Sequence, residues 1–454
     1  MPLTTKERWT LCALVALNVL LKCSWLGVNE LAHDEPFTVY WSQRPMAELW
    51  SLFATENNPP LYFLVIKAWS AFTPFEVAWL RVPSALCSAL TVWPLFLLTR
   101  KLADTRAAVV ACLLFSFSNY HFGFAHEVRA YALFALLSTA CMTVLVSASD
   151  ERNTAWLALL NVLLVYTHFF GWLLLGVQLL VVHLPEFRSH RRRYFTAVGA
   201  AAVAYVPYAF IFARRLGQSV TQGTWLSAPT PEELYNMVWR WSNAPVLAVV
   251  FLLVIVTASA KDRLRHVGLR IGLLWAFVPL LGMFLVSYSV PMFLDRYLVY
   301  AAPGFAVLVA SAVSLLVPKG RATTAVMLTP ALGMLLTFVP WKEGRYEPSR
   351  VVAQANTWCP NGCTHHVWPS WYQLTYRSAL RLDELKEDQS PYLSYDMNRM
   401  AKLTHDTLRP TIVVDGSGFG KAAQQSWYGL LRRTYPNVDS VETDHKVWVY
   451  RFRK

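Results

Sequence analysis

Apolar runs of membrane-spanning length recur along most of this chain, and they restrict it to very few folds. The first run, from Trp9 to Val28, has about 20 residues, the length at which a helix crosses ~30 Å of hydrocarbon. Similar runs follow as far as residue 340. The pattern predicts a mainly α, polytopic membrane protein with about eleven transmembrane helices. After the first, the spans are expected near residues 80–99, 107–124, 130–148, 154–168, 170–184, 195–213, 244–260, 267–287, 297–317 and 323–340.

The composition and the placement of charge agree with this class. Hydrophobic residues make up 55% of the chain and charged residues only 15%, which is unusual for a soluble domain. The formal net charge of +13 could indicate a nucleic-acid partner, but much of the excess lies in alternate short connections. By the positive-inside rule these connections and the N-terminus are cytoplasmic, so no nucleic-acid partner is predicted. The basic connections hold Arg100, Lys101, Arg106, Arg152, Arg188, Arg191 to Arg193, Lys261, Arg263, Arg265, Arg270, Lys319 and Arg321.

The C-terminal segment, residues 341–454, differs in kind from the apolar region before it. It is polar, rich in Trp and Tyr, and has strand-like stretches at Thr411–Val414 and Lys446–Phe452 between helical patterns. We therefore expect a transmembrane domain over residues 1–340 and a small α/β domain over 341–454 on the outer face.

Two cysteines in this C-terminal segment, Cys359 and Cys363, flank a Pro-Asn-Gly turn. An oxidising compartment would permit a disulfide across the turn, which is the favoured interpretation. The alternative is a zinc site that includes His365 and His366, which follow directly.

Polar residues gather where the predicted spans reach the outer face. Asp34 and Glu35 follow the first span, and the amphipathic stretch after them is interrupted by Glu56-Asn57-Asn58-Pro59-Pro60. Neither half is long enough to cross, so two interfacial helices are expected in the first outer loop. Two further polar groups, one from His126 to Tyr131 and one around Arg296 and Tyr297, precede later spans.

Each of these charges alone could be an anchor that reaches the membrane surface from a span end. Acidic and basic side chains that lie at the same depth in the membrane are more typical of a binding or catalytic site than of scattered membrane anchors. The residues expected near this common surface are Asp34, Glu35, Glu56, Lys67, Arg81, Glu127, Arg129 and Arg296.

The residue types in this group indicate a chemistry. Cationic side chains at a lipid boundary suit a phosphate attached to a lipid, and Arg can bind phosphate with two parallel hydrogen bonds. A neighbouring carboxylate can take a proton from an acceptor hydroxyl or amine. The predicted reaction is sugar transfer from a polyprenyl-phosphate donor to a glycan, lipid or protein acceptor. It needs no nucleotide, and the sequence has no P-loop pattern.

At the level of motifs the chain resembles a known family. The Asp34-Glu35 pair, the Asn-Asn-Pro-Pro-Leu-Tyr-Phe segment, the Glu-x-Arg-x-Tyr motif at Glu127 and the late Arg296-Tyr-Leu carry the resemblance. They are similar to the lipid-linked-sugar glycosyltransferases of the GT-C fold, above all glycosyltransferase family 39. Its relatives include protein O-mannosyltransferases and bacterial lipid A aminoarabinose transferases.

The resemblance implies roles for particular residues. Asp34 matches the catalytic base of an inverting, single-displacement reaction, and Glu35 matches a second acid that helps hold acceptor or donor. Arg129 and Arg296 match the residues that hold the donor phosphate. Where aminoarabinose transferases carry a Lys, this chain has Asn57, so Lys67 or Arg81 would substitute. Substrate contacts are further expected from His33, Glu56, Asn58, His126, Glu127, Tyr131 and Tyr297.

Several alternatives accompany this interpretation. No metal or other cofactor is expected to be required, although His33, Asp34 and Glu35 could together hold a divalent cation. His168 could contact substrate, but a polar residue in a tight outer hairpin is the favoured interpretation. A transporter or flippase, or a ligase or polymerase of lipid-linked glycans, is the rival function. The absence of an Asn-x-Ser/Thr sequon favours a bacterial inner membrane, with the site facing the periplasm and an undecaprenyl-phosphate donor.

Overall fold

The structure is a computed structural model, and it is described over part of the chain. The described residues fall into two compact units, one formed by Met1–Leu26 with Arg44–Trp341 and the other by Gly27–Gln43 with Lys342–Lys454. The described residues are 2–31, 34–54, 56, 58–147, 151–222, 226–262, 264–318, 320, 323–340, 348–358, 364–368, 411–416, 426–444 and 447–454.

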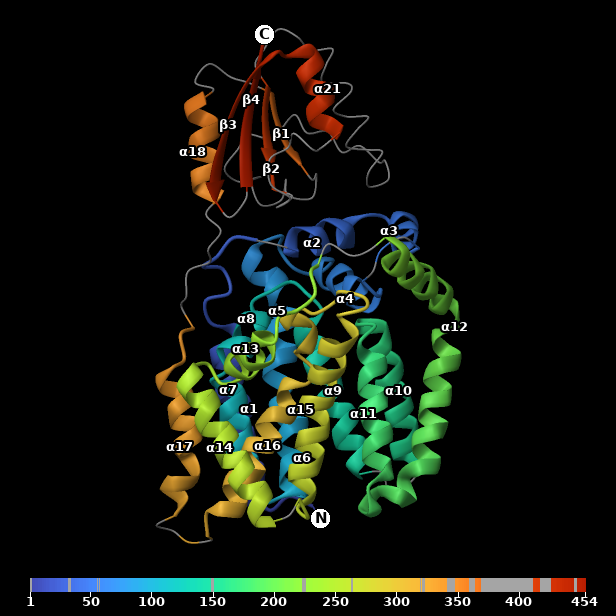
Figure 1. Cartoon of the computed structure of the whole chain (residues 1–454), viewed down its shortest axis with the longest axis vertical. Helices are drawn as coiled ribbons and strands as arrows, with labels where there is room; N and C mark the ends of the chain where they lie inside the picture. Colours follow the sequence, from blue (N-terminus) through green and yellow to red (C-terminus); the bar gives the residue numbers. More distant parts are fainter. Residues whose placement is uncertain are drawn as a thin grey trace. The chain divides into compact units, whose positions relative to one another are not determined.

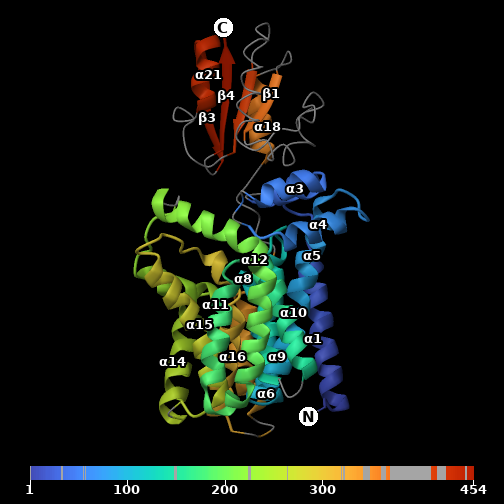
Figure 2. The same cartoon turned by 90° about the vertical axis from the view of Figure 1, so that its right-hand side faces the viewer.

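The first unit is helical, with many of its helices running alongside one another (Figures 1 and 2). Each predicted span overlaps one or two of its helices, and the segment between Arg44 and Glu76 contains two short helices, α3 and α4. The helices are α1 (Thr5–Cys23), α3 (Met46–Phe53), α4 (Leu61–Ser70), α5 (Val77–Leu90), α6 (Val92–Leu102), α7 (Thr105–Ser116), α8 (Asn119–Ala125), α9 (Tyr131–Ser147), α10 (Glu151–Thr167), α11 (Gly171–His183), η1 (Pro185–His190), α12 (Arg191–Gln222), α13 (Glu232–Trp241), α14 (Pro245–Asp262), α15 (Val267–Val286), η2 (Asp295–Leu298), α16 (Ala302–Leu316) and α17 (Thr324–Leu336).

Only some of the helical segments are long and apolar enough to cross a membrane by themselves. Among the described residues four segments qualify: Val77–Leu102, Pro185–Gln218, Pro245–Asp262 and Val267–Val286. A fifth is formed if α7 and α8, which meet at a bend of 61°, count as one span. Others are shorter, such as α9 with 17 residues, which extends only about 26 Å at 1.5 Å per residue. The figure of about eleven spans therefore stays a prediction.

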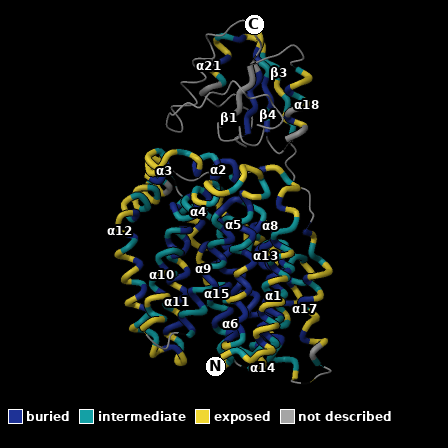
Figure 3. The backbone as a smooth tube through the Cα atoms, turned by 180° about the vertical axis from the view of Figure 1, so that it is seen from behind, coloured by how far each residue is buried: buried dark blue, intermediate teal, exposed yellow. Residues whose placement is uncertain are grey.

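The first unit exposes large apolar side chains on its outer helices. On α12, Phe210 is 79% exposed, and on α17, Leu336 is 77% exposed. Figure 3 shows such exposed positions recurring along the peripheral helices. Apolar surface of this extent is costly in water and costs nothing in lipid. Further examples are Val203, Val206, Val246, Val249, Leu253, Val256 and Leu332.

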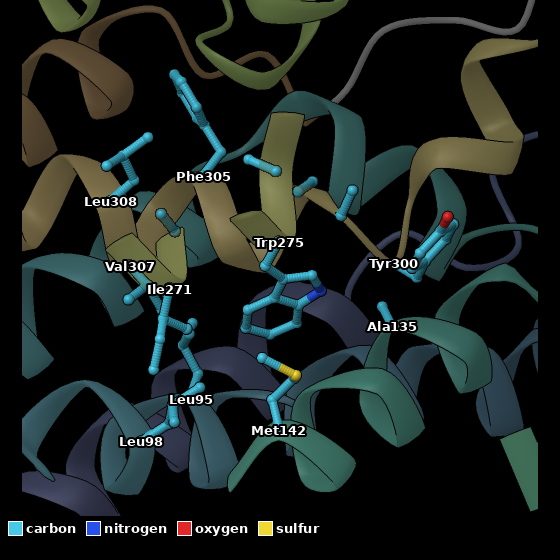
Figure 4. Close-up of a cluster of buried hydrophobic side chains, with 14 of the residues drawn as sticks. Leu95, Leu98, Ala135, Met142, Ile271, Trp275, Tyr300, Phe305, Val307 and Leu308 are labelled. Carbon is cyan, nitrogen blue, oxygen red and sulfur yellow. The ribbon is translucent and has the colours of Figure 1, made fainter. Parts of the chain in front are cut away.

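The core of the first unit is centred on α16, which is buried from Ala302 to Val313. Small residues allow its neighbour α15 to approach closely. A Cβ added to Gly272 would lie 2.6 Å from the Cβ of Leu308, and one added to Gly304 would lie 2.7 Å from Cγ of Trp275. Figure 4 shows Trp275 and Leu308 within this cluster of buried side chains.

Polar side chains fasten the helix ends on the predicted cytoplasmic side. Thr4 and Glu7 form a capping box at the start of α1. Glu7 Oε1 also accepts hydrogen bonds from Nε of Arg100 and Oγ1 of Thr105, each at 2.6 Å. One carboxylate therefore joins the start of α1, the end of α6 and the start of α7.

The bend between α7 and α8 brings Asn119 to the end of α17. Asn119 Nδ2 donates to the carbonyl of Thr337 at 2.9 Å, and its Oδ1 accepts from the backbone N–H of Val339 at 2.8 Å. Oδ1 of Asn243 in turn accepts from the backbone N–H of Asn119 at 2.8 Å. Three segments far apart in sequence are fastened at this point.

The second unit contains a four-stranded sheet, which confirms the predicted small α/β region. The strand order is β1-β2-β4-β3, in which β1 and β2 are parallel and the other pairs are antiparallel. Val413, Leu431, Tyr435, Tyr450 and Phe452 form its core. Cys359 and Cys363 lie outside the described residues. The elements of the unit are α2 (Glu35–Gln43), α18 (Pro348–Trp358), β1 (Thr364–Trp368), β2 (Thr411–Asp415), α21 (Ser426–Thr434), β3 (Asn437–Asp444) and β4 (Val447–Arg453).

Candidate functional site

Arg129 lies in the short connection between α8 and α9, and its backbone is fixed by neighbouring helices. Its N–H donates to the carbonyl of Glu127 at 2.8 Å, and its own carbonyl accepts from Oγ of Ser84 at 3.3 Å. Ser84, on α5, is also hydrogen-bonded to the hydroxyl of Tyr62 on α4. Because the single proton of Ser84 goes to Arg129, Tyr62 donates in that pair.

The guanidinium of Arg129 is the centre of a polar chain. The side chain is 8% exposed, and Nη2 donates to Oδ1 of Asn58 at 3.2 Å. Nδ2 of Asn58 donates to Oε1 of Glu56 at 3.1 Å, and the Asn58 carbonyl accepts from the hydroxyl of Tyr208 at 3.4 Å. The structure thus brings together Glu56, Asn58 and Arg129, which the sequence placed in one site, and adds Tyr208 from α12.

The two arginines predicted to hold the donor phosphate converge on one imidazole. The guanidinium of Arg129 lies 5.8 Å from the ring centre of Tyr131, and that of Arg296 lies 5.9 Å from the ring centre of Tyr297. The ring of His168 lies 6.3 Å from that of Tyr131 and 5.4 Å from that of Tyr297. The start of α9 and the η2 turn therefore meet around His168.

Asp295 holds the η2 turn in place. Its Oδ1 accepts from the backbone N–H of Arg296 at 2.8 Å, and its carbonyl accepts from the hydroxyl of Tyr120 on α8. Its carboxylate also forms an ion pair with Arg240 on α13. The sequence did not indicate a role for Arg240 in the site, because a cationic residue on an amphipathic helix usually faces solvent.

A second basic group lies at the end of α1. Arg81, 3% exposed, donates from Nη1 to the carbonyl of Leu26 at 2.8 Å. Nε2 of His126 donates to the carbonyl of Lys22 at 3.1 Å. Burial, followed by the positive charges of Lys22 and Arg81, lowers the pKa of His126 from 6.5 to about 4. His126 is therefore a neutral hydrogen-bond donor near neutral pH.

Lys22 itself is fully buried, which its position in the sequence does not indicate. Its ammonium lies 5.1 Å from the ring centre of Phe122 and 5.8 Å from that of Phe115, within cation–π range. In sequence it is a cation at the end of a span, a position at which a lysine usually reaches toward the surface.

The remaining predicted residues are placed as follows. Lys67 is half-buried and donates from Nζ to the carbonyl of Arg44 at 2.6 Å. Asp34 and Glu35 belong to the second unit, at the start of α2. Asp34 is partly exposed, its carbonyl accepts from the N–H of Thr38 at 3.3 Å, and Glu35 is 3% exposed. His33 lies outside the described residues.

The described residues contain no group of three His, Cys, Asp or Glu side chains that could hold a metal ion. His33, one member of the possible cation site named from the sequence, falls outside that search.

Comparison with known proteins assigns the fold. A family model described as dolichyl-phosphate-mannose-protein mannosyltransferase matches residues 57–208, a range that includes Asn58, Arg129 and Tyr208. The crystal structure of ArnT from Cupriavidus metallidurans bound to undecaprenyl phosphate aligns with 97% of each chain, at a TM-score of 0.66 and 14% identity. The chain has the GT-C fold.

Other structures with the GT-C fold agree. The apo state of the same ArnT covers 99% of this chain and 98% of its own, at a TM-score of 0.65 and 14% identity. The oligosaccharyltransferase of Archaeoglobus fulgidus, in complex with Zn and sulfate, covers 82% of this chain and 61% of its own, at 0.52 and 12% identity. No curated protein sequence matches the chain. The GT-C fold and the apolar helices together identify an integral membrane protein.

Proposed function

We propose that this protein is an inverting glycosyltransferase that moves a sugar from a polyprenyl-phosphate donor to an acceptor at the outer face of the membrane. The observation that carries the proposal is that Arg129 and Arg296, each beside a tyrosine ring that faces the buried His168, converge in a chain with the GT-C fold. The ArnT structure that shares this fold holds undecaprenyl phosphate, the kind of ligand that two such arginines suit.

The arginines would bind the phosphate and stabilise its departure. As the bond from the anomeric carbon to the phosphate oxygen breaks, negative charge grows on the phosphate. Fixed guanidinium groups aimed at this oxygen stabilise the transition state more than the ground state. The hydrogen bond from Arg129 to Asn58, together with the link from Asn58 to Glu56, fixes the guanidinium before the donor arrives.

The acceptor would be activated by Asp34, whose role rests on the sequence match. Its carboxylate takes the proton of an acceptor hydroxyl or amine, whose oxygen or nitrogen attacks the anomeric carbon. The bond to phosphate breaks, its electron pair leaves with the polyprenyl phosphate, and one displacement inverts the configuration. The partial exposure of Asp34 suits contact with an acceptor, and the burial of Glu35 suits a supporting contact.

We place this reaction in a bacterial inner membrane, with the site on the periplasmic side and undecaprenyl phosphate as the lipid carrier. The positive-inside distribution of Lys and Arg and the absence of a glycosylation sequon support this orientation. The acceptor is a glycan, a lipid or a protein, and no cofactor is required.

The test is to incubate the purified full chain with a panel of polyprenyl-phosphate sugars and a membrane extract as acceptor source. We expect one donor to be consumed and its sugar to appear, by mass, on an acceptor with release of polyprenyl phosphate. Consumption of no donor would overturn the proposal. Movement of the intact lipid-linked sugar between leaflets without a product would instead establish a flippase.

A further inference from the structure

His168 lies between α10 and α11 and is buried, with 4% of its surface exposed. Its N–H donates to the carbonyl of Leu164 at 3.1 Å, and its carbonyl accepts from the N–H of Gly171 at 2.8 Å. A Cβ on Gly171 would lie 3.0 Å from the Leu164 carbonyl oxygen, so the connection is closely packed. His168 therefore lies in a tight connection between two helices, and its side chain is buried.

The hydrogen bonding of the imidazole determines its tautomer. Nδ1 accepts a hydrogen bond from the backbone N–H of Phe170 at 3.3 Å, so the ring is neutral and its proton is on Nε2. Nε2 has no hydrogen-bond partner among the residues that the structure describes. The ring is buried, yet Nε2 is not one of the fully enclosed polar atoms, so a partner from outside the chain can reach this donor.

The ring is also held rigidly. It stacks on Phe134 with ring centres 5.0 Å apart and planes 13° apart, and on Phe170 at 5.4 Å and 18°. Phe169 packs against it at 4.9 Å. Aromatic neighbours at such distances leave the imidazole little freedom to rotate, so the direction of the Nε2 proton is set in advance.

We infer that His168 is a further donor-binding residue, whose Nε2–H group donates a hydrogen bond to a phosphate oxygen of the polyprenyl-phosphate donor between Arg129 and Arg296. The inference rests on the proposed function. A neutral donor at this position adds a directional hydrogen bond without placing a third positive charge beside two guanidinium groups. Tyr131 and Tyr297 enclose the same space.

Two substitutions at this position separate the hydrogen bond from the packing. In His168→Asn the amide ends near the position of Nδ1, so it can keep the contact with Phe170 but cannot supply the distal donor. In His168→Gln the longer amide reaches the position of Nε2 and can donate there. His183→Asn, at the exposed opposite end of α11, is the control.

The experiment measures binding of undecaprenyl phosphate without sugar to the purified full chain, by native mass spectrometry or ligand-induced fluorescence change. We expect His168→Asn to weaken binding about tenfold, because a hydrogen bond to a charged group contributes on that order, and His168→Gln to recover most of the loss. His183→Asn should bind as the parent does.

The outcomes are distinguishable. If the parent binds and His168→Asn binds equally well, the inference is overturned and the proposed function stands. If both His168 variants lose binding equally, the residue acts through packing and the inference is again overturned. If the parent itself binds no polyprenyl phosphate, both the proposed function and the inference about His168 are overturned.

Discussion

Asn58 accepts a hydrogen bond from Arg129 at 3.2 Å across two segments that the sequence separates widely. The same amide donates to Glu56 at 3.1 Å, so its oxygen faces the cation and its nitrogen faces the anion. This orientation links the guanidinium to the Glu56 carboxylate through one amide, which positions the Arg129 side chain.

The relationship predicts the effect of changing Asn58. Asn58→Asp places a carboxylate directly on Arg129 and should weaken donor binding about tenfold or more, since charged hydrogen bonds contribute about 1.5–3 kcal/mol. Binding of undecaprenyl phosphate is the measurement. Asn236→Asp, at another Asn–Glu contact on α13, is the matched control. Unchanged binding in Asn58→Asp would show that Arg129 does not hold the donor.

Substitution of Arg129 or Arg296 should weaken the binding of the sugar donor. Arg129→Ala and Arg296→Ala should each raise the KM for the donor about tenfold to a hundredfold, because each removes a charged contact to phosphate. Lysine at either position should recover only part, since it lacks the planar pair of donors. Steady-state kinetics with the donor varied, and with Arg214→Ala on α12 as control, provide the check. A normal KM in both alanine variants contradicts the phosphate role.

Asp34→Asn should abolish transfer and leave donor binding intact. The substitution keeps the size of the side chain and removes the base, and general base catalysis contributes about 10²–10⁴-fold. Glu35→Gln should lower activity less. Single-turnover rates, together with membrane yield and binding of undecaprenyl phosphate, separate loss of catalysis from loss of folding. Wild-type turnover in Asp34→Asn would remove this residue from the mechanism.

A chelator should leave sugar transfer unchanged, because the proposed reaction uses no metal. The measurement is the transfer rate after dialysis against EDTA, with and without added Mg²⁺, Mn²⁺ or Zn²⁺. Loss of activity that one of these cations restores would instead support a cation bound near His33, Asp34 and Glu35.

The capping carboxylate of Glu7 should make stability depend on pH in the acid range. Hydrogen bonds from Thr105, Thr4 and Arg100 lower the pKa of Glu7 from 4.5 to about 2. Its contribution is therefore fully present above pH 4.5 and is lost as the pH falls from 4.5 toward 2.

Glu7→Gln removes this titration. Between pH 6 and 3 the melting temperature of the detergent-solubilised parent should fall more steeply than that of the variant. Glu233→Gln on α13 serves as the comparison. Parallel melting curves for the parent and Glu7→Gln would contradict the role assigned to this carboxylate.

The helices and the two arginine positions could be predicted from the sequence because their signals are local. Apolar runs located the helices, and the polar groups at span ends located Arg129 and Arg296. The break between α7 and α8 was not predicted: residues 107–124 form one apolar run, and the run conceals Ser118, which caps α8 by accepting from the N–H of His121 at 3.3 Å.

Other parts of the site had no local signal at all. Tyr208 lies in the middle of a long apolar helix, where a tyrosine is an ordinary core residue, and its hydroxyl gains a role only because α12 passes Asn58. The buried position of Lys22 likewise depends on Phe115 and Phe122, which reach it only after α7 and α8 have packed. Tertiary contacts of this kind cannot be inferred from periodicity.

The contacts of Asn119 have a mechanical consequence. Because one side chain holds both the carbonyl of Thr337 and the N–H of Val339, the end of α17 cannot separate from α8 unless both hydrogen bonds break together. The next residue of α8 is Tyr120, whose hydroxyl holds Asp295 beside Arg296. A force applied to the chain after α17 would therefore be transmitted to the η2 turn, which carries Arg296. The side chains of Asn119 and Tyr120 would transmit it.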